Sequence, residues 1–180
     1  MVKSTNPVIV IETALGEISL ELFINQAPLT SQNFLTYVQN GDFDSSSFYR
    51  VVRPDTLSSN PVPNAIPIEV IQGGLGMAPH ANKRDPIILE RTSETGLSHK
   101  EGALSMGRLE PNSASSEFFI CVSDQPELDF GGKRNPDGQG FAAFGQVISG
   151  MDVVKAIWQC PAVGQKLEPE IAIHKIYVAK

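Results

Sequence analysis

The chain has 180 residues, of which 41% are hydrophobic and 19% are charged, and its formal net charge is −6. This length and composition fit one globular domain over residues 1–180 and exclude an intrinsically disordered chain. The acidic balance argues against a surface that binds nucleic acid, because such surfaces neutralise phosphates with Lys and Arg.

Two cysteines, Cys121 and Cys160, are too few for a disulfide framework, and their spacing does not suit a zinc site. No apolar run approaches the length of a membrane span, and no apolar core follows the first six residues as in a signal peptide. We therefore expect a cytoplasmic protein without membrane association. The alternative is a periplasmic protein whose signal peptide has been removed.

The first elements read as a hairpin followed by a helix. Residues 8–13 form a short apolar run, and after a turn residues 17–24 alternate between apolar and polar side chains. This pattern predicts an antiparallel pair of strands. Pro28 is suited to a first helical position and Gly41 to the residue beyond a helix end, which predicts a helix over residues 28–40.

Two short strands and two long loops follow. Residues 48–52 and 68–72 have the length and apolar content of strands. The four prolines of residues 53–67 predict a surface loop without regular structure. Residues 75–101 form a second, largely polar loop with short apolar islands.

The central part of the chain holds two apolar runs of strand length, residues 103–106 and 118–121. The polar connection between them is rich in small residues, which allow a backbone to lie close to another chain. A bound extended peptide and plain tight packing both explain that composition. Residues 124–140, rich in Gly, Pro and Asp, predict a further loop.

The last elements are a strand over residues 141–147, a helix that stops before Pro161, and a strand over residues 171–178. The apolar phase of that strand shifts between Ile173 and Ile176, which indicates a β-bulge. About eight strands and two helices without βαβ alternation predict a mainly β fold. A closed eight-stranded antiparallel β-barrel capped by two α-helices fits best, because closure removes edge strands.

No pattern points to metal or covalent chemistry. His80, His99 and His174 are scattered and are expected at the surface or in turns rather than as metal ligands. No serine lies in a Gly-x-Ser-x-Gly elbow. We expect no metal and no cofactor.

Several segments, in the correct order, resemble the signature of the cyclophilins, a family of peptidyl-prolyl cis-trans isomerases, in a bacterial-like form. The segments are Phe48-Tyr49-Arg50-Val51-Val52, Ile71-Gln72-Gly73-Gly74, Leu104-Ser105-Met106, Pro111-Asn112, Ser116-Glu117-Phe118-Phe119-Ile120, Leu128-Asp129 and Phe144-Gly145. The resemblance extends from about Val8 to Val178 and implies the same capped barrel. It also implies an isomerase of Xaa-Pro bonds that assists protein folding and binds proline-containing polypeptides as a monomer. The alternative is a proline-binding or chaperone-like module with little turnover.

The resemblance also implies roles for individual residues. Arg50 would be the catalytic guanidinium, although a strand arginine can equally be a plain surface residue. The substrate-binding residues would be Phe48, Gln72, Met106, Gly107, Arg108, Glu117, Phe119, Leu128 and Phe141. Among these, an apolar pocket would hold the proline ring and the backbone near Gly107 would pair with an extended peptide. Ordinary core packing is the competing explanation for the apolar members.

Four positions depart from the family pattern. Glu69 replaces a phenylalanine, Glu117 a glutamine, Glu127 an aromatic residue that is often tryptophan, and Phe141 a histidine. In relatives that bind cyclosporin, the tryptophan donates a hydrogen bond to the drug. Because an ionised glutamate only accepts hydrogen bonds, we expect weak cyclosporin binding.

Overall fold

The computed structural model describes residues 6–58 and 66–180. Their strands are β1 (Val8–Thr13), β2 (Gly16–Leu22), β3 (Ser47–Val52), β4 (Val70–Gly74), β5 (Ala103–Met106), β6 (Phe118–Cys121), β7 (Ala143–Ser149), β8 (Ala162–Val163) and β9 (Lys166–Val178). Their helices are α1 (Pro28–Gln39), α2 (Pro54–Ser58), α3 (Thr92–Thr95), α4 (Met151–Trp158) and the 3₁₀ helix η1 (Pro126–Leu128).

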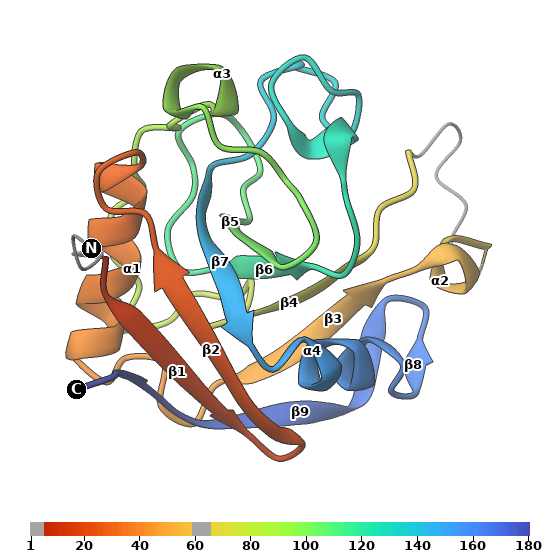
Figure 1. Cartoon of the computed structure of the whole chain (residues 1–180). Helices are drawn as coiled ribbons and strands as arrows, with labels where there is room; N and C mark the ends of the chain where they lie inside the picture. Colours follow the sequence, from red (N-terminus) through yellow and green to blue (C-terminus); the bar gives the residue numbers. More distant parts are fainter. Residues whose placement is uncertain (1–5, 59–65) are drawn as a thin grey trace.

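Eight of these strands close into a barrel (Figure 1). The strand order is β1-β2-β7-β5-β6-β4-β3-β9-β8, and β1 pairs back onto β9. Every pairing is antiparallel, and β8 is a two-residue hairpin partner at the start of β9. The predicted closed eight-stranded antiparallel barrel is therefore confirmed.

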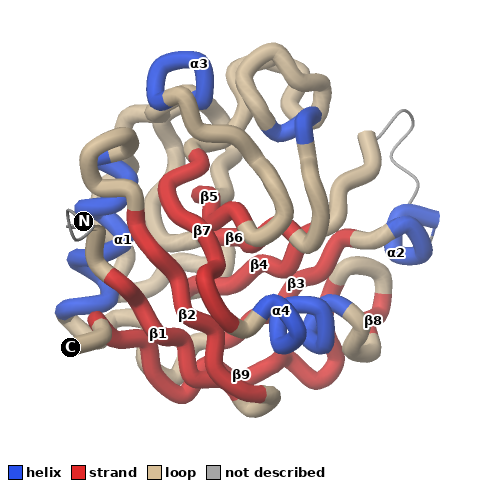
Figure 2. Tube along the Cα trace, in the orientation of Figure 1, coloured by secondary structure: helices blue, strands red, loops and turns tan. Residues whose placement is uncertain are grey.

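The two longer helices, α1 and α4, are shown with the barrel strands in Figure 2. Both pack apolar residues into the barrel core. Helix α1 contributes Phe34 and Tyr37, and α4 contributes Val154 and Ile157. Pro28 begins α1, and the helix ends within one residue of the predicted bound. No helix in residues 6–58 and 66–180 is both long enough and apolar enough to cross a membrane.

Several predicted element bounds differ from the structure, among them those of the proline-rich loop and of β4. Residues 54–58 of the predicted irregular loop form α2, because proline is tolerated in the first turn of a helix; residues 59–65 of that loop lie outside the described residues. Strand β4 runs through Gly73 and Gly74 instead of ending before them. Gly73 lies between Phe48 and Phe118, and a Cβ there would come within 2.9 Å of the Ser47 carbonyl oxygen.

The predicted bulge of the last strand is confirmed. Glu12 pairs with Lys175 and Thr13 with Ile173, so His174 is the extra residue of β9. The strand itself begins earlier than predicted, at Lys166, because its first residues pair with β8.

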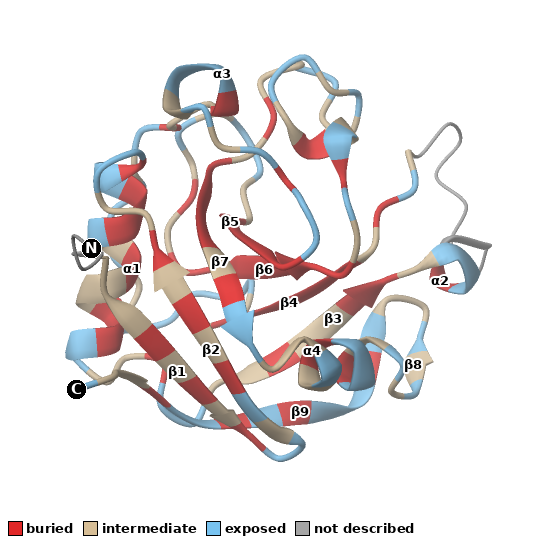
Figure 3. Cartoon of the chain, in the orientation of Figure 1, coloured by how far each residue is buried: buried red, intermediate tan, exposed pale blue. Residues whose placement is uncertain are grey.

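Side chains of β3, β4, β5 and β6 alternate between two apolar clusters, and β5 and β6 are buried throughout (Figure 3). The larger cluster fills the barrel interior. The smaller cluster lies on the outer face and consists of Val52, Ile68, Val70, Ala103, Phe119, Cys121 and Leu128, with Phe141 packed against it. This outer cluster positions the site described next.

Candidate functional site

A cleft of about 550 Å³ opens above the outer apolar cluster. We call it the Arg50 cleft. Eight of the ten predicted site residues line it: Arg50, Gln72, Gly107, Arg108, Glu117, Phe119, Leu128 and Phe141. The strands β3, β4 and β6 and the segments that follow β5 and η1 bring these residues together from distant parts of the chain.

A β-bulge in β3 sets the direction of Arg50. Phe48 pairs with Gly73 and Arg50 pairs with Gln72, so Tyr49 is an extra residue without its own partner on β4. In a regular strand, residues two apart share a face. The bulge instead leaves Phe48 in the barrel core, while both Tyr49 and Arg50 line the cleft.

Two neutral amides hold the Arg50 guanidinium. Its Nη1 donates to Oε1 of Gln72 at 2.7 Å, and its Nε and Nη2 donate to Oε1 of Gln165 at 2.9 and 2.7 Å. Burial lowers the pKa of Arg50, and the nearby charge of Arg134 lowers it further. Three hydrogen bonds from two amides thus orient the guanidinium, and neither amide carries a charge that would neutralise it.

A chain of hydrogen bonds continues from Gln72 across the cleft wall. Nε2 of Gln72 donates to the Tyr49 hydroxyl at 2.9 Å, and that hydroxyl donates to Oε2 of Glu117. The other Glu117 oxygen accepts from the Ser116 hydroxyl at 2.8 Å. Burial raises the pKa of Tyr49, and its bond to Glu117 adds to the rise, so the phenol stays a donor.

The floor of the cleft is apolar. Phe119, Leu128 and Val70 belong to the outer cluster, and Phe141 meets Phe119 edge to face with ring centroids 5.5 Å apart. An edge-to-face pair fixes both rings beyond what area burial achieves. Such a floor beside an oriented guanidinium suits a small apolar ring next to a carbonyl group.

Phe119 rests on a buried histidine. The His99 ring stacks on the Phe119 ring with centroids 6.0 Å apart. Its Nδ1 lies 2.7 Å from Oδ1 of Asp129, and its Nε2 lies 2.8 Å from Oγ of Ser105. His99 is 1% exposed, so the expectation of a surface or turn position was wrong. Although Ser105, His99 and Asp129 are connected as in a hydrolase triad, Ser105 is fully buried and no substrate can reach it. The group supports Phe119 from beneath.

Arg108 forms a side wall. Its Nη1 and Nη2 donate to the two Asp137 oxygens at 2.9 Å each, and its guanidinium lies over the Phe141 ring at 5.2 Å. The bond from Arg108 lowers the pKa of Asp137. A charged pair of this kind ties Phe141 to the loop that carries Asp137.

Two predicted substrate-binding residues are in the core instead. Met106 is 1% exposed and pairs with Phe118, both pointing into the barrel, whereas its neighbour Ser105 pairs with Phe119 on the outer face. Strand alternation therefore excludes Met106 and Phe119 from one pocket. Phe48 is fully buried, because the bulge turns its side chain into the barrel core while Arg50 faces the cleft.

Sequence reasoning missed several residues that line the cleft or contact Arg50. Alternation back from Gln72 would have found Val70, and the motif around Arg50 already contained Tyr49. Gln165 precedes the last strand without any motif, and Arg134 lies in a loop whose composition carries no signal for a cleft. Only tertiary structure brings these last two residues to Arg50.

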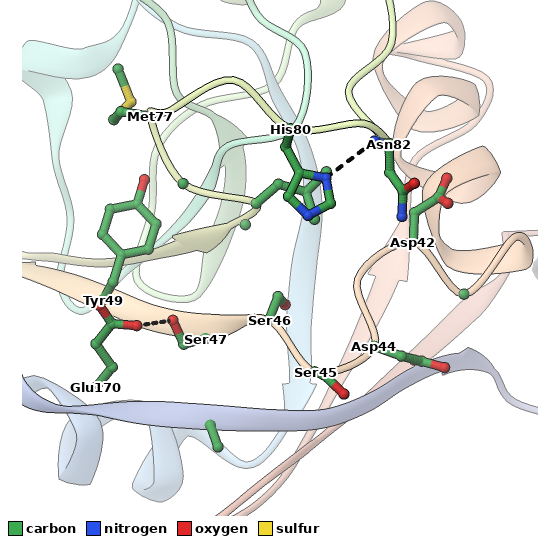
Figure 4. A pocket seen from close by; sticks show the side chains of 15 residues that line it. Asp42, Asp44, Ser45, Ser46, Ser47, Tyr49, Met77, His80, Asn82 and Glu170 are labelled. Carbon is green, nitrogen blue, oxygen red and sulfur yellow. Dashed lines mark hydrogen bonds between the residues drawn. The ribbon is translucent and has the colours of Figure 1, made fainter.

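A second hollow of about 860 Å³ adjoins the cleft and shares Tyr49 and Met77 with it (Figure 4). Asp42 and Glu170 are among its lining residues. Glu170 accepts a hydrogen bond from the hydroxyl of Ser47, another lining residue, at 2.6 Å. Over the described ranges, no group of three or more His, Cys, Asp or Glu side chains could hold a metal ion. The Arg50 cleft is thus where the predicted site residues converge.

Comparisons with known proteins show the family of this chain. A family model described as cyclophilin type peptidyl-prolyl cis-trans isomerase/CLD matches residues 8–178. A peptidyl-prolyl cis-trans isomerase of Acinetobacter baylyi is 35% identical over 157 residues, which cover 87% of this chain and 74% of that protein. Peptidyl-prolyl cis-trans isomerase B of Escherichia coli is 36% identical over 146 residues, covering 79% of this chain and 78% of that protein.

Solved structures show the same fold. A Cryptosporidium parvum cyclophilin type peptidyl-prolyl cis-trans isomerase matches with a TM-score of 0.76 at 24% identity, covering 97% of this chain and 98% of that chain. A crystal structure of the same kind of protein, in the presence of the dipeptide Ala-Pro, matches with a TM-score of 0.75 at 25% identity, covering 96% and 99%. These relatives are named as isomerases, which does not favour the alternative of a binding module without turnover. The chain belongs to the cyclophilin-type peptidyl-prolyl cis-trans isomerase family.

Proposed function

We propose that this protein catalyses cis-trans rotation about Xaa-Pro bonds in proline-containing polypeptides and thereby assists protein folding. One observation supports the assignment of roles. The Arg50 guanidinium, held by Gln72 and Gln165, lines one wall of a cleft whose floor is apolar. In this proposal, Phe119, Leu128 and Phe141 receive the proline ring. The backbone near Gly107 pairs with the extended substrate.

The chemistry needs no nucleophile. The imide bond has partial double-bond character, and its rotation faces a barrier of about 18–20 kcal/mol. In the twisted transition state resonance is lost, so the proline nitrogen becomes a better hydrogen-bond acceptor. A donor that is already oriented and partly desolvated stabilises this state more than the planar ground state. Arg50 has these properties because two amides fix its fork of donors while burial removes competing water.

The test is an isomerisation assay on a short Xaa-Pro peptide with wild type and Arg50→Ala. Loss of one preorganised donor should lower kcat/KM by about 10²–10³-fold. Circular dichroism should show that the variant keeps its fold, because Arg50 lines a cleft and is absent from the core clusters. Equal turnover in the two proteins would remove Arg50 from the mechanism. Absence of turnover in the wild type would overturn the proposed function.

We also propose that the protein acts as a cytoplasmic monomer that binds neither nucleic acid nor membranes. The net charge of −6 opposes binding to phosphates, and two free cysteines suit a reducing compartment. Closure of the barrel pairs both sides of its strands, which disfavours edge-to-edge association. Sedimentation and cell fractionation test these points, with the periplasm as the alternative compartment.

Weak cyclosporin binding is part of the same proposal. Glu127 is anchored within its own loop, since its Oε2 accepts from the backbone nitrogen of Lys133 at 2.7 Å. A carboxylate at this position offers a drug carbonyl no donor.

A further inference from the structure

The Arg50 cleft carries a positive charge in a protein whose net charge is negative. Among the described residues that line it, four are cationic, Arg50, Lys83, Arg108 and Arg134, and one is a carboxylate, Glu117. The Glu117 oxygens are already engaged by Tyr49 and Ser116. The cleft therefore has cationic groups that its own acidic lining does not balance.

The three arginines differ in how their charges are compensated. Arg108 forms a two-point ion pair with Asp137. Arg50 bonds only neutral amide oxygens, and Arg134 donates from Nη1 to the carbonyl oxygen of Ile66 at 2.8 Å. Within residues 6–58 and 66–180, neither Arg50 nor Arg134 pairs with a carboxylate. Two uncompensated guanidinium groups thus face one cleft.

The loop that carries Arg134 is held firmly against the apolar floor. The backbone nitrogen of Arg134 donates to the Glu127 carbonyl at 3.1 Å, and that of Phe141 donates to the Leu128 carbonyl at 2.9 Å. Gly132 lies so close that a Cβ would come 2.4 Å from the Glu127 carbonyl oxygen. Arg134 is consequently placed beside Leu128 by its backbone and does not depend on a flexible arm.

Unused hydrogen-bonding capacity lies at the same wall. Nδ2 of Asn135, which also lines the cleft, is buried and has no partner within the described part of the chain. Among the described residues, the Arg134 guanidinium bonds only Ile66, which leaves four of its N–H groups available. Burial lowers the pKa of Arg134, and its charge contributes to lowering that of Arg50, so the two cations repel each other across partly desolvated space.

We propose that Arg134 and Arg50 form an anion subsite that selects Xaa-Pro segments with an acidic side chain directly beside the proline. A carboxylate there offsets the repulsion between the two guanidinium groups and accepts from the free donors of Arg134. The partial burial of both arginines strengthens this attraction relative to one at an open surface. Arg134 thereby sets substrate preference, while Arg50 acts on the bond that rotates. This inference rests on the proposed binding of Xaa-Pro segments in the cleft.

Matched peptides test the proposal. Two pairs differ only by Glu or Gln, placed before the proline in one pair and after it in the other. At one of these positions, kcat/KM and affinity should favour the Glu peptide by roughly ten-fold in the wild type. In Arg134→Gln the ratio of Glu to Gln peptide should approach one. In Arg134→Glu the Glu peptide should be disfavoured, and a third peptide with Lys at the same position should be preferred over both. Arg134→Lys should keep a reduced preference.

Lys133→Gln is the matched control. It changes the net charge by the same amount in the neighbouring residue, but Lys133 is exposed and does not line the cleft. Its Glu-to-Gln ratio should equal that of the wild type. The preference should also weaken as salt rises from about 0.01 to 1 M, because the Debye length shortens from about 30 to 3 Å.

The affinities are measured by calorimetric titration as well as by turnover, which separates the two proposals. A Glu preference in binding without any isomerisation would defeat the proposed function and leave the anion subsite standing. A ratio near one at both positions in the wild type would overturn the subsite. The subsite would also be overturned if Arg134→Gln left the Glu preference unchanged, or if Lys133→Gln removed the preference as fully as Arg134→Gln does.

Discussion

Arg50 of β3 and Gln72 of β4 lie directly opposite each other, and the guanidinium Nη1 donates to the amide Oε1 at 2.7 Å. Because Gln72 also donates to Tyr49, its amide has a defined orientation. Gln165 holds the guanidinium from the other side. The direction of Arg50 therefore depends on two amides from different strands and loops, which makes their removal informative.

Replacing Gln165 by leucine should lower kcat about ten-fold while leaving KM nearly unchanged. The variant loses two hydrogen bonds to a charged group that position Arg50, and such bonds contribute about 1.5–3 kcal/mol each in proteins. Steady-state kinetics on one Xaa-Pro peptide measures both constants. Gln165→Glu keeps an acceptor oxygen and should recover part of kcat, whereas the exposed Gln159→Leu should have no effect. A pure KM change in Gln165→Leu would refute the positioning role.

Tyr49→Phe should destabilise the fold by about 1–3 kcal/mol, because the nearly buried Glu117 and Gln72 each lose a partner. Denaturant unfolding measures this loss at neutral pH. The wild type also has a pH signature. The folded-state pKa of Tyr49 is raised above its ordinary value of 10.0, so the contribution of the neutral phenol is complete below about pH 10. That contribution declines as the pH rises toward the folded-state pKa.

The difference in stability between wild type and Tyr49→Phe should therefore shrink above pH 10. Comparison of the two proteins removes the contributions of the other tyrosines with raised pKa, Tyr37 and Tyr177. A constant difference from pH 8 to 11 would contradict the assigned role of the phenol.

Substitutions at Phe119 and Met106 should separate the cleft from the barrel interior. Phe119→Ala should weaken binding of an Xaa-Pro peptide and lower the free energy of unfolding by roughly 3–5 kcal/mol, because a nearly buried aromatic ring is lost. Met106→Leu should cost less than about 1.5 kcal/mol and leave peptide affinity unchanged, because Met106 points into the barrel. Peptide titration and thermal melting provide both readouts. Equal effects of the two variants on affinity would show that the interior and the cleft are not separate.

Cyclosporin inhibition should be roughly ten- to a thousand-fold weaker than in a relative with tryptophan at the position of Glu127. The carboxylate supplies no donor, and bringing its charge out of water against a drug carbonyl adds a further cost. Glu127→Trp should recover part of the affinity and leave peptide turnover almost unchanged. Inhibition of the wild type at nanomolar drug, or no gain in the variant, would count against this prediction.

The barrel and most of the cleft were predictable because each depends on local patterns. Strand alternation and turn residues located β1, β2 and α1, and the motif around Arg50 pointed to the cleft. The misplacement of Met106 has a geometric origin. Motif order says nothing of the face on which a side chain lies, so Met106 was placed with Phe119 although neighbouring strand positions point to opposite faces.

Other misses depend on long-range structure. Gln165 and Arg134 reach the cleft from segments without regular pattern, more than 80 residues after Arg50 in the chain. His99 carries no local sign of burial, since its partners Ser105 and Asp129 come together only when the barrel and the following loop are formed.

The bulge at Tyr49 allows strand length and side-chain chemistry to be varied separately. Between Phe48 and Val52, five residues of β3 face four residues of β4, and Tyr49 is the surplus one. A chain shortened by that single residue would match β4 one for one, with Arg50 still directed outward and Phe48 still inward. Deletion of Tyr49 thus removes a phenol and a kink together, whereas Tyr49→Phe removes the hydroxyl alone. The contrast between these two proteins distinguishes what the local twist of β3 contributes from what one oxygen atom contributes.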